Sequence, residues 1–67
     1  MKLDTNKFEK VLADKGLMLK DLCDKAELAE VTLRNIRQGK RTPRPATLGR
    51  IAKALGVDVQ DIIQEGD

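Results

Sequence analysis

The sequence predicts an all-α fold in which residues 1–67 form one compact domain of five short helices. Apolar residues recur three and four positions apart, which is the spacing of one face of an α-helix. The sequence shows no alternation of apolar and polar residues typical of a strand, and no internal repeat. Four of the five glycines follow a helix-like stretch, where a left-handed residue commonly ends a helix: Gly16, Gly39, Gly56 and Gly66.

The first two helices are expected over residues 4–15 and 19–25. On the first helix, Phe8, Val11 and Leu12 have the i, i+3, i+4 spacing of a face that packs on a core. The second helix shows the same spacing over two turns, so it too should bury one face. Its apolar stripe consists of Leu19, Leu22, Cys23 and Ala26.

The third and fourth helices are expected on either side of a connection that contains both prolines. The third spans residues 30–38, with Leu33 and Ile36 facing the core. The fourth begins near Pro45, because proline has its φ angle already set for the first helical position and its missing N–H is not needed there. The core stripe of this fourth helix consists of Leu48, Ile51, Ala52 and Leu55.

A short fifth helix is expected over residues 59–64. Asp58 would cap its N-terminus, and Asp61 stands three positions later, as in a capping box. Val59, Ile62 and Ile63 are its apolar residues. The predicted core of the whole domain consists of Phe8, Leu12, Leu22, Cys23, Leu28, Leu33, Ile36, Leu48, Ile51, Ala52, Leu55 and Ile62.

The link between the second and third helices is very short, because only residues 26–29 separate them. Such a link forces a sharp turn between two packed helices, which is the geometry of a helix-turn-helix. A domain of this size buries only about 60% of the surface that its unfolded chain exposes. We therefore expect a small core and a stability of only a few kcal/mol.

The residue types that are missing exclude several functions. The chain has no histidine and a single cysteine, so it can form neither an internal disulfide nor a zinc site built on cysteine and histidine. Without histidine it also lacks the usual general base of a nucleophilic site, and it has no glycine-rich loop that would cradle a phosphate. We therefore expect a protein that is not an enzyme and that needs no metal and no cofactor.

The sequence also contains no membrane segment. It has no stretch of about 18 apolar residues that could cross a bilayer. The first residues, Met1 to Asp4, do not start the apolar run of a signal peptide. We expect a cytoplasmic protein that has no membrane partner.

The net charge of +2 hides a strong asymmetry along the chain. Residues 1–33 carry a net charge of −1, residues 34–53 carry +7 with no acidic residue, and residues 54–67 carry −4. A charge run is usually a solvated face. A band without acids across two helices, however, repels itself unless an anion meets it, and all five arginines lie in it. Arginine suits bidentate contact with phosphate or guanine, so this band is expected to face nucleic acid.

The segment from Leu22 to Ile63 resembles the phage-repressor and Cro-like helix-turn-helix family, also called the Xre family. The residues that carry the resemblance are LCDKAELAEVTLRNIRQGKRTP and TLGRIAKALGVDVQDII. The resemblance implies a lambda-repressor-like domain of five helices, in which helices two and three form the helix-turn-helix. It also implies that helix two lies across the DNA backbone and that helix three, residues 30–38, enters the major groove.

The resemblance also implies which residues would contact DNA. On the third helix, the base-reading candidates are Glu30, which could accept from the cytosine amino group, Val31, which could touch a thymine methyl, and Asn35, which could read adenine. Arg34 would reach a phosphate or a guanine. The phosphate-binding candidates are Lys20 on the second helix and, in the connection after the third, Lys40, Arg41 and Arg44.

Several positions depart from the family pattern. Glu27 stands where the turn usually has glycine, so either a left-handed glutamate costs roughly 1 kcal/mol there or the turn differs from that of the family. Ala29 replaces the polar cap of the third helix, and Arg37 stands where glutamate is common, which adds to the positive field. Glu30 and Arg34 are four positions apart, so an internal ion pair on the helix is an alternative to base contact.

These observations predict a sequence-specific regulator of transcription that binds double-stranded DNA and acts as a repressor. Because one domain makes few base contacts, a homodimer on a two-fold operator is expected, formed in solution or on DNA. The alternative is a protein-interaction module or an antitoxin-type partner. Such a protein would use the apolar residues Met18, Leu19 and Val31, and its basic band would serve only solubility.

Overall fold

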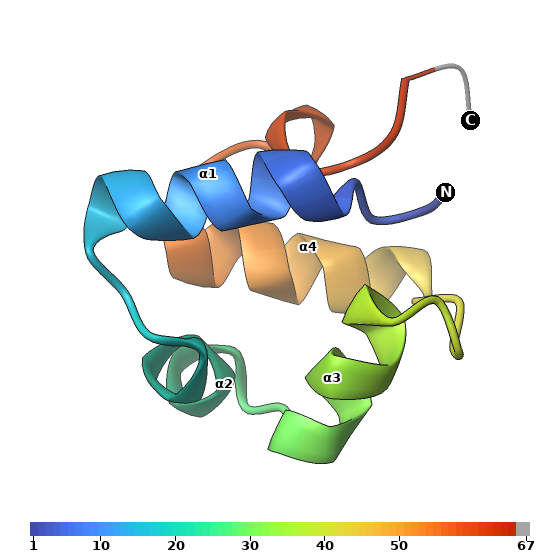
Figure 1. Ribbon diagram of the computed structural model, residues 1–67, viewed down its shortest axis with the longest axis horizontal. Coiled ribbons are helices and arrows are strands. Elements are labelled where there is room, and N and C mark those ends of the chain that lie inside the picture. The colour runs from blue at the N-terminus through green and yellow to red at the C-terminus, as the bar shows by residue number, and fades with distance from the viewer. Residues whose placement is uncertain (66–67) are drawn as a thin grey trace.

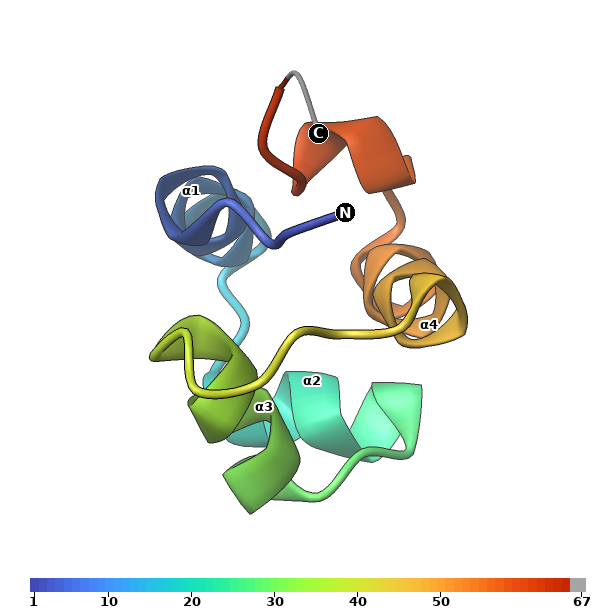
Figure 2. The same cartoon turned by 90° about the vertical axis from the view of Figure 1, so that its right-hand side faces the viewer.

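The computed structural model describes residues 1–65 of the chain. It contains α1 (Thr5–Lys15), α2 (Leu19–Ala26), α3 (Glu30–Arg37) and α4 (Pro45–Leu55), followed by η1 (Val59–Asp61), a single 3₁₀ turn. In the view of Figure 1, α4 lies between α1 and η1 above it and α2 and α3 below it, and Figure 2 shows that α4 forms one edge of the molecule, opposite α1. The all-α class is confirmed, and α1 to α4 have the predicted boundaries to within one residue or two.

The predicted fifth helix is wrong, because the chain leaves the helical path after η1. The expected bond between the Asp58 N–H and the Asp61 carboxylate does form, at 3.1 Å. The following residues pair instead with the start of the chain. The Asp4 N–H donates to the Ile62 carbonyl at 2.8 Å, and the Gln64 N–H donates to the Lys2 carbonyl at 3.0 Å. These bonds need an extended backbone, so a helix over residues 59–64 cannot form with them.

The pairing of the two chain ends forms an antiparallel bridge between Leu3 and Ile63. No strand pairing is expected from the sequence, and this bridge is the one such contact within residues 1–65. It carries the Leu3 side chain into the core, where only 6% of its surface stays exposed. Leu3, which lies just before the first residue of α1, therefore covers one side of the core. The spacing of apolar residues along a helix does not predict this role, because Leu3 lies outside the helices.

The core largely matches the predicted set. Leu12 and Leu28 are corrections, because they pack against the core from its margin and are only half-buried. Both stand close to a chain reversal, where the helices no longer enclose a side chain. The core cluster itself consists of Leu3, Phe8, Leu22, Cys23, Leu33, Ile36, Leu48, Ile51, Ala52, Leu55 and Ile62.

The turn between α2 and α3 is built as the sequence suggested. Glu27 has φ 56° and ψ 44°, and within residues 1–65 it is the one non-glycine residue with a positive φ angle. Its N–H donates to the Asp24 carbonyl at 3.4 Å, and the next N–H, from Leu28, donates to the Cys23 carbonyl at 3.0 Å. These bonds satisfy the end of α2 and turn the chain sharply into α3.

The glycines predicted to end helices behave as expected where the structure describes them. Gly16 and Gly56 end α1 and α4 with φ angles of 64° and 74°. Gly39 has φ 77°, directly after the last residues of α3. The fourth such glycine, Gly66, lies outside the described residues. No helix in residues 1–65 is long and apolar enough to cross a bilayer.

Candidate nucleic-acid interface

The surface of α3 divides cleanly into a buried and an exposed side. Leu33 and Ile36 hold the helix on the core, with 0% and 5% of their surface exposed. The predicted base-reading residues lie on the other side of the helix. Glu30, Val31 and Arg34 are exposed, and Asn35 is half-buried. The helix begins without a side-chain cap at Ala29, as the sequence indicated.

The charged groups on the exposed side of α3 do not pair with each other. No ion pair joins Glu30 to Arg34 in the part of the chain that the structure describes, although their spacing would permit one. Val31 is 57% exposed between them. The exposed side of α3 therefore offers an acceptor, an apolar group and a bidentate donor side by side, which are the chemical types that distinguish base edges in the major groove.

The connection from α3 to α4 presents three cations to solvent. Lys40, Arg41 and Arg44 are exposed and make no ion pair within residues 1–65. The connection is held in place by the buried side chain of Pro43 and by a 2.9 Å bond from the Lys40 N–H to the Asn35 carbonyl. The predicted phosphate-binding residues of this segment thus lie together on a fixed backbone.

A hollow of about 220 Å³ opens where this connection meets α3 and α4. Arg41 and Arg44 line it, and no carboxylate does. Its other polar lining residues were not predicted as site residues from the sequence: Thr32 of α3, Thr42 of the connection and Thr47 of α4. No local pattern marks these threonines, because they come from three segments that meet only in the folded chain. Two arginines and three hydroxyls suit an anion such as a phosphate.

Lys20 stands apart from this group. It lies in the first turn of α2, is exposed, and makes no ion pair within the described residues. The helix begins at Met18, which has no capping side chain and is 72% exposed. The Met18 N–H instead donates to the Asp21 carboxylate at 3.4 Å. Lys20 is therefore free to meet a phosphate, but on a different element from the other cations.

The basic band of residues 34–53 does not form one surface. Arg37 turns back toward α1 and bonds to the Glu9 carboxylate. Arg50, on α4, lies 3.4 Å from the Glu27 carboxylate at the turn after α2. Both arginines pair with an acid of another element, so the positive field predicted at Arg37 is partly offset by the Glu9 carboxylate. The cations left open on α3 and its connection are Arg34, Lys40, Arg41 and Arg44.

Cys23 is a packing residue, as expected. It is 2% exposed, and burial raises the pKa of its thiol, with the charges of Glu30 and Asp24 adding to the shift. A raised pKa keeps the thiol protonated and unreactive. Within residues 1–65, no cluster of cysteine and acidic side chains is arranged to hold a metal ion.

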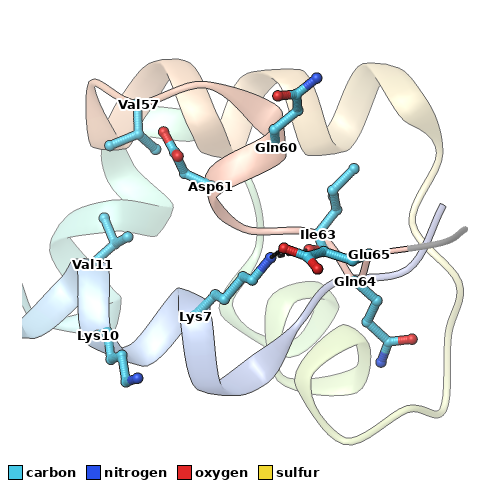
Figure 3. Close-up of a pocket in the computed structure, with 9 residues that line it drawn as sticks. All are labelled: Lys7, Lys10, Val11, Val57, Gln60, Asp61, Ile63, Gln64 and Glu65. Carbon is cyan, nitrogen blue, oxygen red and sulfur yellow. Dashed lines mark hydrogen bonds and ion pairs between the residues drawn. The ribbon is translucent and has the colours of Figure 1, made fainter.

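A larger hollow lies on another side, between α1 and the segment after α4 (Figure 3). It encloses about 690 Å³ over an apolar strip of Val11, Val57 and Ile63. Lys7 closes one end, where its ammonium donates to the Ile63 carbonyl at 3.2 Å and lies 3.5 Å from the Glu65 carboxylate. This groove faces away from α2 and α3, so it is separate from the candidate interface (Figures 1 and 2).

Comparison with known proteins agrees with this geometry. A family model described as a Cro/C1-type helix-turn-helix DNA-binding domain matches residues 7–64. The chain belongs to this family. The matched residues include α1 from Lys7 onward and the whole of α2, α3, α4 and η1 of this Cro/C1-type domain. A comparison with curated proteins found no match.

Solved structures share the fold of this Cro/C1-type domain. The restriction-modification controller protein C.AhdI from Aeromonas hydrophila has a TM-score of 0.77 and 18% identity, over 85% of this chain and 86% of that one. The clp gene regulator ClgR from C. glutamicum has a TM-score of 0.74 and 24% identity, over 85% and 74% of the chains. The controller protein C.Esp1396I has a TM-score of 0.73 and 26% identity, over 81% and 69%.

Proposed function

We propose that this Cro/C1-type domain is a sequence-specific transcriptional regulator that represses by occupying an operator in double-stranded DNA. The single observation that carries this proposal is that the exposed side of α3 is followed directly by a connection with exposed, unpaired cations. The similar structures include controller proteins and a gene regulator, which supports a regulatory role. No chemical step is required, because the activity is occupancy.

In the proposed complex, α3 lies in the major groove. Val31 touches a thymine methyl, Asn35 pairs with adenine, and Glu30 accepts from a cytosine amino group. Arg34 binds a guanine edge or the nearest phosphate. The exposure of Glu30, Val31 and Arg34 supports these roles, and Asn35 lies at the border between the exposed side of α3 and the core.

The phosphates of the DNA backbone are held from two elements. Arg41 and Arg44 bind one phosphate at the hollow between α3 and α4, with Lys40 beside them, and Lys20 of α2 binds another across the groove. These contacts carry little sequence information, but they set the position of α3. Two copies on a two-fold operator would double the number of base contacts, so we propose a homodimer as the bound species.

A selection of bound sites from random duplex DNA tests this function directly. We expect a palindromic consensus, because each copy reads one half-site. A fluorescence-anisotropy titration on the selected site should then show log K falling with log salt at a slope of about −5 to −7, since a dimer would neutralise about six to eight phosphates. A slope near zero, or a selection that returns no consensus, would refute the proposal.

The second candidate is a protein-interaction module or antitoxin-type partner, and one observation favours it. Met18 and Val31 are large apolar residues that expose 72% and 57% of their surface. A protein complex on these residues would survive mutation of the cations of the connection. A Met18→Ser variant that still binds the selected DNA but loses a co-purifying protein would support this second role.

A further inference from the structure

A second hollow lies on the other side of the α3–α4 connection, where the N-terminal segment approaches it. It encloses about 320 Å³. Three cations from three segments line it: Lys2, Arg37 and Arg41. Its lining includes the hydroxyls of Thr5 and Thr42 but no carboxylate. In both views of the ribbon, the start of the chain lies on the same side of the molecule as this connection (Figures 1 and 2).

The position of Lys2 is determined by the paired chain ends. Its carbonyl accepts the 3.0 Å bond from the Gln64 N–H, and its neighbour Leu3 is buried and bridged to Ile63. The backbone from the Lys2 carbonyl to Leu3 is therefore held by the paired chain ends, while the Lys2 side chain is exposed. An anchored backbone lowers the entropy that a lysine loses when it binds a ligand.

The hollow has more positive charge and more donors than its own residues can satisfy. Neither Lys2 nor Arg41 makes an ion pair within residues 1–65. Arg37 bonds to Glu9 through one terminal nitrogen, and its buried Nε has no hydrogen-bond partner in the described chain. A buried donor without a partner is costly, and cations that converge without an acid attract an anion.

We infer that this hollow is a binding site for a phosphate group, held by Lys2 and Arg41. On the proposed function, that group is a phosphate of the DNA backbone next to the one held by Arg41 and Arg44. The two hollows share Arg41, Thr42 and Pro43, so they lie side by side along the connection. Each DNA strand carries one charge per about 3.4 Å of helix axis, so neighbouring phosphates of one strand suit two hollows that lie side by side.

The test compares Lys2→Gln with Lys15→Gln. Lys15 is an exposed lysine at the far end of α1, so its replacement removes the same charge from a site away from the connection. On the selected operator, Lys2→Gln should reduce the magnitude of the salt slope by about 0.9 for each copy bound, which is about 1.8 for a dimer. Lys15→Gln should leave the slope unchanged. Adding Lys2→Gln to an Arg41→Gln variant should have a smaller effect, because both cations hold one phosphate.

A second arm uses inorganic phosphate and the free protein. We expect phosphate to shift the amide signals of Lys2, Thr5 and Thr42 in ¹⁵N-resolved NMR spectra, and Lys2→Gln to weaken the response. A response here with an unchanged salt slope on DNA would assign the site to a free phosphate group. The inference is overturned if Lys2→Gln behaves like Lys15→Gln in both arms. The proposed function fails separately, if the unmodified protein shows no salt-dependent DNA binding.

Discussion

The paired cations beside α1 and the open cations of the connection after α3 use the same residue types in opposite ways. Lys7 of α1 bonds to Glu65 and to the Ile63 carbonyl, and Arg37 of α3 bonds to Glu9 of α1. In the connection, Lys40 and Arg41 have no acidic partner within residues 1–65. A paired cation ties two segments together, whereas an open one can exchange its water for a ligand. The difference separates cations engaged within the fold from cations that are available to a ligand.

The largest effect is expected at the paired chain ends. Ile62 is 0% exposed, and its carbonyl receives the Asp4 N–H. Ile62→Ala should cost about 2–5 kcal/mol through lost burial and a residual cavity, which is enough to unfold much of so small a domain. Urea unfolding followed by circular dichroism measures the loss. Ile62→Val provides a milder variant with an expected cost of about 0.5–1.5 kcal/mol. An Ile62→Ala protein as stable as the parent would contradict the role assigned to this region.

The next effect should appear in binding and leave folding unchanged. Arg41→Glu/Arg44→Glu should lower DNA affinity on the order of 100-fold, because two phosphate contacts become repulsions. The urea midpoint should stay the same, since both side chains are exposed and unpaired. Lys10→Glu/Lys15→Glu makes the same change of charge on α1. If that control lost as much affinity, general charge and not a local site would explain the binding.

A smaller effect is expected at the turn between α2 and α3, where Glu27 pairs with Arg50 and also adopts an unfavourable backbone conformation. Glu27→Gly should stabilise the domain by up to about 1 kcal/mol, because glycine adopts φ 56° without the steric cost of a side chain. Glu27→Gln serves as the control, since it removes the charge near Arg50 but keeps the strained conformation. Thermal unfolding should rank the glycine variant above the parent and the glutamine variant at or slightly below it. The reverse order would argue that the ion pair dominates at this turn.

The smallest effect is expected when a paired cation is converted into an open one by removing its acidic partner. Glu9→Gln removes the acidic partner of Arg37, and the loss of such a partly exposed pair should cost about 0.2–1 kcal/mol of stability. The freed arginine lies beside the hollow at Lys2, so DNA affinity at low salt should rise slightly. Urea unfolding and DNA-binding anisotropy, measured on one preparation, test the expected fall in stability and the expected rise in DNA affinity. A rise in stability, or a fall in affinity, would show that the pair has another role.

Stability should also depend on pH through Cys23. Its pKa is raised in the folded state by burial, so the unfolded chain releases the thiol proton at a lower pH than the folded one. The contribution is fully present below the ordinary thiol pKa and is lost as the pH rises toward the folded value. Urea unfolding of the parent should weaken over this alkaline range more than that of Cys23→Ala. Parallel curves for the two proteins would contradict the shift.

The sequence by itself determined the parts of the fold that depend on near neighbours. The boundaries of α1 to α4 follow from apolar spacing, from Pro45 at a helix start and from glycines at helix ends. The left-handed turn at Glu27 followed from comparing one position with the family pattern. The side of α3 that carries Glu30, Val31 and Arg34 is set by the burial of Leu33 and Ile36. All of these are interactions within one or two helical turns.

Only the tertiary structure decided the features that join distant segments. The capping pattern at Asp58 and Asp61 favoured a fifth helix, but hydrogen bonds to Lys2 and Asp4 ended it after one turn. The uniform basic band was divided when Arg37 found Glu9 on another helix. Lys2, from a segment of nearly balanced charge, was brought to the basic connection. Spacing along a chain sets which residues share a helical face, whereas an ion pair or a bridge between segments depends on how the faces pack.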